Sequence, residues 1–172
     1  MAAINTRGII SFAMLVMVLL TGCKAHQSNQ AQSQIVELQD QIRKMKEDYK
    51  PGFGDLMGII QTHHAKLWYA GTNQNWQLAE FEIHEIEETF EKISELHGDR
   101  YNASQLIPAF ILPFLESTGK AARSKDIVAF KDRYAQLTSG CNNCHANAGF
   151  GFIVIQTPTE PAFTNQDFKI GN

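Results

Sequence analysis

Apolar residues recur every three or four positions over most of the chain after residue 50, which is the spacing of helices that each bury one face. The repeat predicts helices over residues 53–69, 76–96, 104–120 and 124–148. Pro51 and Gly52 break the chain before the first helix. A turn from Gly71 to Asn75 follows that helix, and Gly98 ends the second. Because no extended run alternates apolar and polar residues before the tail, the pattern indicates an all-α fold.

Four helices joined by short breaks are typical of an up-down-up-down four-helix bundle, which we place over residues 51–148. In the third helix we expect Pro108 in the opening turn and a kink at Pro113. Ser124 is a suitable cap for the fourth helix. The second helix has an inward apolar stripe made of Ala79, Ile83, Ile86, Phe90 and Ile93. Its other faces carry one lysine, Lys92, and the acidic residues Glu80, Glu82, Glu85, Glu87, Glu88, Glu91 and Glu95.

The 172 residues include 15 lysines and arginines and 18 acidic residues, so the formal net charge is −3. The hydrophobic share of 44% suits one folded domain and excludes a disordered chain. Binding to phosphates needs a basic surface, so nucleic-acid binding is excluded as a function. The glutamate-rich second helix, which we take as a solvated face, would attract a basic partner protein if it has a function.

The first 22 residues have the features of an export signal. Arg7 precedes a largely apolar run over residues 9–20, which is too short to span a membrane, and small residues follow it. Leu20, Thr21, Gly22 and Cys23 resemble the lipobox of bacterial lipoproteins, in which the cysteine becomes the acylated first residue. The resemblance implies that Cys23 anchors the chain to a lipid bilayer. Lys24 in the next position favours the outer membrane, on its periplasmic side.

Residues 23–50 are expected to form a lipidated tether with one short helix. A polar, glutamine-rich stretch comes first, and apolar residues then alternate at spacings of three and four. This short heptad seam consists of Ile35, Leu38, Ile42, Met45 and Tyr49. Two heptads are marginal as an isolated coiled coil, so we favour an amphipathic helix that lies on the same molecule. A coiled coil that makes a homodimer is the alternative.

Residues 141–145 read Cys-Asn-Asn-Cys-His, the C-x-x-C-H pattern of covalent haem attachment. Two thiols three residues apart lie on one side of a helical turn, where they reach the two vinyl groups of one porphyrin. His145 then comes beneath the iron as an axial ligand. Haem is attached in this way outside the cytoplasm, in agreement with the export signal. The sequence therefore predicts one covalent haem c held by Cys141, Cys144 and His145.

Three other uses of the cysteines compete with haem attachment. A thioredoxin-like redox pair usually follows a strand, and no strand is predicted before Cys141. A zinc site needs four ligands, and Cys23 is the one other cysteine in the sequence. A disulfide across two intervening residues adds little stability. We therefore place haem attachment first.

A haem motif on the last helix of an exported four-helix bundle resembles the class II cytochromes c, the cytochrome c′ and cytochrome c-556 group. The resemblance covers residues 51–148 and implies that Phe130 and Tyr134, on the approach to the motif, contact the haem. The segments His64–Trp68 and Phe152–Ile155 are also similar to segments of a group of exported monohaem cytochromes.

Two features depart from typical cytochrome c′. Ser139 and Gly140 stand where a basic residue often precedes the motif, and 27 residues follow His145. We expect the last part of this segment, the tail of residues 149–172, to be extended and to pack on the bundle. Its apolar side chains either fill the end of the bundle or cover an exposed haem edge.

The tail holds neither methionine nor histidine, so a second axial ligand must come from earlier in the chain. The candidates are Met45, Met57, His26, His63, His64, His84 and His97. In class II relatives that have a sixth ligand, the first helix supplies it. We therefore expect His64 first, His63 second and Met57 third, with a five-coordinate iron as the alternative.

The number of axial ligands separates two functions. Two strong ligands exclude small molecules and suit electron transfer, whereas an open iron binds nitric oxide or carbon monoxide. No Ser/His/Asp or paired-carboxylate arrangement indicates an enzyme. We expect a membrane-anchored c-type cytochrome that passes electrons between periplasmic proteins. The alternatives are a five-coordinate haem protein that binds a gas and a structural lipoprotein without haem.

Overall fold

The computed structural model describes residues 30–161 and 163–169, and within these ranges every regular element is a helix. This confirms the predicted all-α class. The chain divides between Lys50 and Pro51 into two units, which are described separately. The predicted export signal, Cys23, His26 and the start of the tether lie outside the described residues.

The first unit is described from residue 30, and residues 30–48 form a single helix. The side chains of the heptad seam are all exposed, four of them on this helix and Tyr49 directly after it. Asp40 pairs with Lys44 at 3.0 Å and also with Arg43. None of the helices in the described ranges is both long and apolar enough to cross a membrane.

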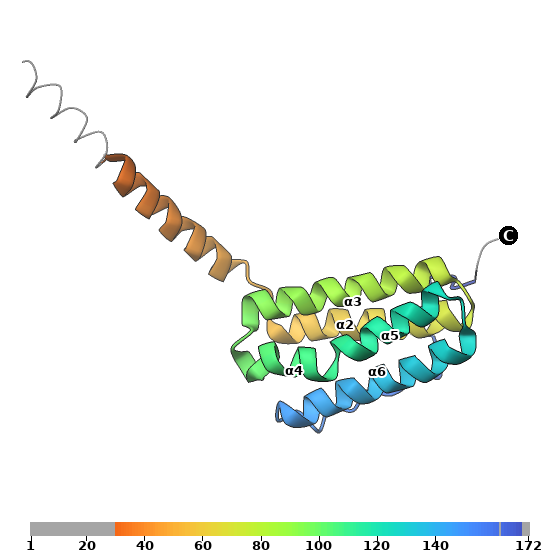
Figure 1. Cartoon of the computed structure of the whole chain (residues 1–172). Coiled ribbons are helices and arrows are strands. Elements are labelled where there is room, and N and C mark those ends of the chain that lie inside the picture. Colours follow the sequence, from red (N-terminus) through yellow and green to blue (C-terminus); the bar gives the residue numbers. More distant parts are fainter. Residues whose placement is uncertain (1–29, 162, 170–172) are drawn as a thin grey trace, which may run out of the picture. The chain divides into compact units, whose positions relative to one another are not determined.

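The second unit contains five α-helices and one 3₁₀ turn within its described residues. In chain order they are α2 (Phe53–Thr72), α3 (Trp76–His97), η1 (Arg100–Asn102), α4 (Ala103–Phe110), α5 (Leu112–Arg123) and α6 (Ile127–Asn147). Figure 1 shows these helices side by side along a common direction. The helix α2 packs on α3, α5 packs on α6, and α3 packs on α5. The elements therefore enclose one shared core.

The core is built from the apolar faces that the helical repeat predicts. All members of the stripe predicted for α3 are buried. Leu56, Ile60 and Leu67 bury the facing side of α2, and Phe130 and Leu137 that of α6. Burying a side chain of this size contributes about 1.5–3 kcal/mol, so these stripes provide most of the force that holds the helices together.

The third predicted helix is divided into α4 and α5 at Ile111, whose backbone has φ −115° and ψ −58°. Pro113 lies in the first turn of α5 and has no N–H to donate to the preceding turn, which explains the break. The expectation for Pro108 was wrong, because this residue lies inside α4. The short helix tolerates the loss of one backbone hydrogen bond.

Ser124 does not cap α6, contrary to prediction. It ends α5, and Lys125 follows with a φ of +54° that turns the chain. The cap of α6 is Asp126, whose carboxylate accepts hydrogen bonds from the backbone N–H groups of Val128 and Ala129, both at 3.0 Å. A carboxylate also interacts favourably with the positive end of the helix dipole, so Asp126 is the better cap.

Candidate functional site

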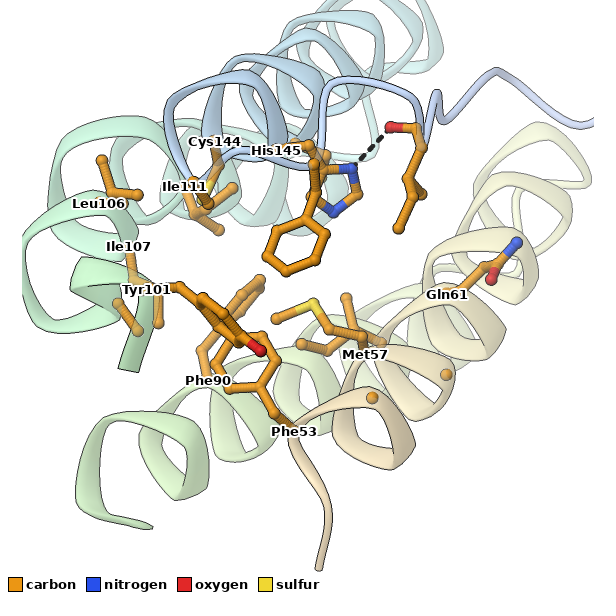
Figure 2. A pocket seen from close by; sticks show the side chains of 18 of the residues that line it. Phe53, Met57, Gln61, Phe90, Tyr101, Leu106, Ile107, Ile111, Cys144 and His145 are labelled. Carbon is orange, nitrogen blue, oxygen red and sulfur yellow. Dashed lines mark hydrogen bonds between the residues drawn. The ribbon is translucent and has the colours of Figure 1, made fainter. Parts of the chain in front are cut away.

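A cavity of about 630 Å³ lies among α2, α4, α6 and the chain that follows α6. Its volume is in the range of about 300–1,000 Å³ that is usual for cofactor sites. Figure 2 shows apolar side chains around most of its wall. They include Phe53, Ile60, Phe90, Leu106, Ile107, Ile111, Phe150 and Ile155. Segments far apart in the sequence thus enclose one apolar space.

All three residues of the predicted haem motif line this cavity. Cys141, Cys144 and His145 lie in the last two turns of α6. Gly140, directly before them, allows α6 to approach α4 closely. A Cβ atom at Gly140 would lie 2.3 Å from the carbonyl oxygen of Phe110. A side chain at this position would push the motif away from the helices that form the opposite wall.

The two thiols are free and protonated at neutral pH. Burial raises the pKa of Cys141 to about 12, and the neighbouring Cys144 adds to this shift. Burial also raises the pKa of Cys144. Redox-active C-x-x-C pairs instead have a thiol with a lowered pKa, commonly at a helix N-terminus. Because Cys141 and Cys144 lie in the last third of the 21-residue α6, the helix dipole does not stabilise a thiolate here.

The imidazole of His145 is held by the chain that follows α6. Its Nδ1 lies 2.9 Å from the carbonyl oxygen of Ile153, and Figure 2 draws this hydrogen bond. A carbonyl oxygen can only accept, so Nδ1 carries the proton and donates it. Nε2 therefore carries no proton and keeps its lone pair. An axial iron ligand requires an unprotonated ring nitrogen of this kind.

Aromatic side chains close one end of the cavity. The ring of Tyr101 packs edge-on against Phe53, with ring centroids 5.2 Å apart, and against Phe150 at 4.8 Å. Tyr101 and Asn102 have φ values of +56° and +57°, an uncommon conformation for residues other than glycine. The turn between α3 and α4 thus places a tyrosine ring on the cavity wall, which no sequence pattern had indicated.

His64, the predicted first choice for the second axial ligand, has both ring nitrogens in hydrogen bonds. The hydroxyl of Thr138 donates to the Tyr134 carbonyl at 3.0 Å, so its oxygen accepts from His64 Nε2–H, also at 3.0 Å. The Tyr134 hydroxyl lies 3.0 Å from Nδ1 and also 3.0 Å from the backbone carbonyl oxygen of His64, to which it donates. Burial lowers the pKa of His64 to about 4, so the ring is neutral. His64 also lines the cavity, but both of its ring nitrogens lie within hydrogen-bond distance of these two hydroxyls, which counts against it as a metal ligand.

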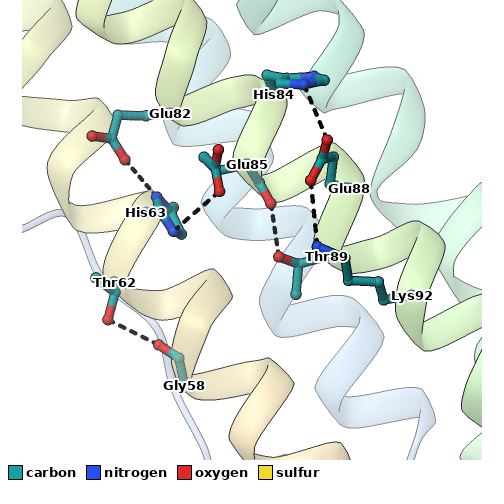
Figure 3. A network of polar contacts seen from close by, with 9 residues as sticks. All are labelled: Gly58, Thr62, His63, Glu82, His84, Glu85, Glu88, Thr89 and Lys92. Atoms are coloured by element: carbon teal, nitrogen blue, oxygen red, sulfur yellow. Dashed lines mark hydrogen bonds and ion pairs between the residues drawn. The ribbon is translucent and has the colours of Figure 1, made fainter. Parts of the chain in front are cut away.

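His63, the second choice, lies on another side of α2 and does not line the cavity. Its Nδ1 is 2.6 Å from a carboxylate oxygen of Glu82, and its Nε2 is 3.9 Å from Glu85, as Figure 3 shows. Glu82 is only 1% exposed, although the helical repeat places it with the solvated glutamates. Burial raises the pKa of Glu82, and His63 opposes this shift. The pair joins α2 to α3 within their interface.

Met57, the third choice, lines the cavity. Figure 2 shows its sulfur directed inward from α2, opposite His145. The contacts of His64 explain this position, because they bring α2 and α6 together at Tyr134 and Thr138. Met57 lies seven residues before His64 on α2. Cys141 and His145 lie seven residues after Tyr134 and Thr138 on α6. Seven residues span about 10 Å of a helix, so Met57 and the motif lie at about the same level.

Phe130 and Tyr134, expected to contact the haem, do not line the cavity. Both are fully buried in the core, Phe130 against Trp76 and Tyr134 against His64 and Trp68. They share a helical face with Cys141, but Tyr134 precedes it by about 10 Å along the axis and Phe130 by about 16 Å. Their place in the core does not favour contact with a group in this cavity, and the expectation that they contact a haem stays a prediction.

Sequence reasoning also missed Asn142, whose side-chain amide forms two hydrogen bonds with Ile155. The motif pattern leaves both residues between the cysteines unspecified, so nothing local marked this one. Within the described ranges, no three His, Cys, Asp or Glu side chains are arranged to hold a metal ion by themselves. Comparisons of the chain with family models, curated proteins and solved structures gave no match.

Proposed function

We propose that this protein is an electron-transfer cytochrome that carries one haem c, attached through thioethers to Cys141 and Cys144, with His145 as an axial ligand. The observation that carries the proposal is that both thiols and the His145 imidazole line one apolar cavity of about 630 Å³. When bound, the haem supplies a one-electron iron couple. The side chains around it exclude water and hold its iron ligands.

The thiols support haem attachment over the other uses of the motif. Their raised pKa values disfavour a thiolate redox pair, and they are partly buried against a large apolar space instead of facing solvent. An apolar wall is also what a porphyrin needs, since most of its surface is hydrocarbon. The protonated Nδ1 of His145 leaves Nε2 available to the iron.

For the second axial ligand we propose Met57 in place of His64. The thioether of Met57 is directed into the cavity, whereas both nitrogens of His64 are engaged by Tyr134 and Thr138. A His/Met pair gives a higher reduction potential than a His/His pair and excludes gas ligands from the iron. Electron transfer with little rearrangement is therefore favoured over gas binding.

The finer architecture and the location are part of the same proposal. The helices α2, α3, the α4–α5 pair and α6 are the four members of an up-down-up-down bundle, followed by an extended tail. The chain is exported, acylated at Cys23 and anchored to the outer membrane, facing the periplasm, with residues 23–50 as the tether. Electrons pass to and from other redox proteins, and the exposed glutamates of α3 favour a basic partner.

The decisive experiment is expression of the full chain in a host that matures c-type cytochromes. We expect intact-protein mass spectrometry to find the mass of one haem that survives denaturation. The Cys141→Ala/Cys144→Ala double variant is the matched control and should lack that mass. A wild-type chain of unmodified mass in such a host would refute the proposal.

Absorption spectroscopy of the same material separates electron transfer from gas binding. A six-coordinate, low-spin spectrum in both oxidation states that does not change under carbon monoxide is expected. A high-spin iron that takes up carbon monoxide readily would overturn electron transfer in favour of the gas-binding function. Fractionation tests the anchor, because Cys23→Ser should move the protein from the membrane to the soluble fraction.

A further inference from the structure

Residues 150–155, which we call the strap, run back along the last turns of α6. Gly149 has a φ of +85°, a conformation that favours glycine, and so lets the chain reverse. The backbone N–H of Phe150 donates to the His145 carbonyl at 2.7 Å, and the N–H of Ile153 donates to the Phe150 carbonyl at 2.8 Å. One backbone hydrogen bond therefore connects the start of the strap to His145, and a second one forms a turn within the strap.

Asn142 holds the far end of the strap with both ends of its amide group. The N–H of Ile155 donates to Asn142 Oδ1 at 2.7 Å, and Asn142 Nδ2 donates to the Ile155 carbonyl at 2.9 Å. The Asn142 amide thus satisfies both the N–H and the carbonyl of Ile155, as the backbone of a neighbouring β-strand would. An aspartate lacks the donor for this pairing and an alanine lacks both groups.

This pairing determines where the Ile153 carbonyl points. Ile153 is two residues before Ile155 in the strap, so holding Ile155 on α6 through Asn142 also keeps the Ile153 carbonyl beside α6. There it accepts the hydrogen bond from His145 Nδ1 at 2.9 Å. Asn142 and His145 lie three residues apart on the helix, so the two contacts are on adjacent turns of one face.

We propose that Asn142 is a positioning residue, which acts through the strap to keep the Ile153 carbonyl on His145 Nδ1. The inference rests on the proposed function and deepens it. A hydrogen bond at Nδ1 fixes the tautomer and ring orientation of a metal-bound imidazole and makes it a more basic ligand. A more basic ligand stabilises ferric over ferrous iron, so Asn142 lowers the reduction potential of the haem.

The test compares two alanine variants of adjacent residues in the matured, full-length protein. Asn142→Ala removes the strap pairing. Asn143→Ala is the matched control, because Asn143 is exposed and its side chain makes no hydrogen bond within the described part of the chain. We expect Asn142→Ala to shift the ferric-ferrous equilibrium about tenfold toward ferrous iron, which is a rise of about 59 mV for one electron. Asn143→Ala should keep the wild-type potential.

Equal potentials for Asn142→Ala and wild type would overturn the inference. Hydrogen exchange in the wild-type protein decides the case if Asn142→Ala is not recovered folded. The Ile155 amide proton should then be protected, and exchange at the rate of an unstructured chain would equally overturn it. Mass spectrometry separates this failure from that of the proposed function, because a chain without haem lacks the added mass before any potential is measured.

Discussion

The close approach of α6 to α4 at Gly140 predicts a stability loss from the smallest possible substitution. In Gly140→Ala the new Cβ atom would lie 2.3 Å from the Phe110 carbonyl oxygen and 3.0 Å from Cδ2 of Phe114. The first neighbour is backbone, so it cannot rotate away, and α6 must move by the better part of 1 Å to restore an ordinary contact. Overpacking of this kind costs about 1–3 kcal/mol.

Helix propensity acts in the opposite direction. Alanine is about 1 kcal/mol more favourable than glycine inside a helix, and Gly140 lies inside α6. The net expectation is therefore a loss of up to about 2 kcal/mol in the free energy of unfolding. Because the displaced segment carries Cys141, we also expect a lower yield of haem attachment in the matured protein.

Gly58→Ala is the matched control for this prediction. Gly58 also lies inside a helix, α2, but a Cβ atom there meets nothing within 4 Å. Propensity acts alone at this position, so a gain of about 1 kcal/mol is expected. Urea unfolding of the two apoprotein variants, followed by circular dichroism, measures the difference. If both substitutions stabilise the protein equally, α6 does not approach α4 as closely as described.

Three further predictions follow from the same contacts. Burial lowers the pKa of His64 from 6.5 to about 4 in the folded protein. As the pH falls from about 6.5 toward 4, the imidazole therefore binds a proton in the unfolded chain but not in the folded one, and the free energy of unfolding decreases. At pH 4.5 the loss from this group is about 2–3 kcal/mol, and urea midpoints should show a weaker acid dependence for His64→Gln than for wild type. In the matured protein, Met57→Leu should open the iron to carbon monoxide. His64→Gln should leave the low-spin spectrum unchanged, and the reverse pair of results would favour His64 as the ligand. Asp126→Ala should cost about 1 kcal/mol by removing the cap of α6, whereas Asp132→Ala, at an exposed position within that helix, should leave the urea midpoint nearly unchanged.

The helices that the sequence predicts best are those whose signals are local. The spacing of Ile83, Ile86, Phe90 and Ile93 predicts both α3 and its buried face, because helical geometry brings residues three and four apart together whatever the helix packs against. The C-x-x-C-H motif is equally local, and its two thiols and His145 line one cavity. In both cases the relevant neighbours are within a few residues along the chain.

The errors concern residues whose surroundings come from distant segments. Glu82 belongs by count to the solvated side of α3, yet it is buried because His63 of α2 supplies a partner in the interface. Met57 and His64 share one face of α2, so the sequence does not decide which of them reaches the motif. Both side chains line the cavity, and what favours Met57 in our proposal is the pair of hydrogen bonds from His64 to Tyr134 and Thr138, which no periodicity in the sequence shows.

The amino-acid sequence by itself therefore determined the helical class, the buried stripes and the grouping of Cys141, Cys144 and His145, since these depend on periodicity and on residues close in the chain. The tertiary structure alone decided the register between α2 and α6, the cavity in front of the motif and the pairing of Asn142 with the strap. These features arise from contacts between residues separated by up to 74 positions, as for His64 and Thr138. Such contacts depend on packing and chain reversal, which leave no periodic signal in the sequence.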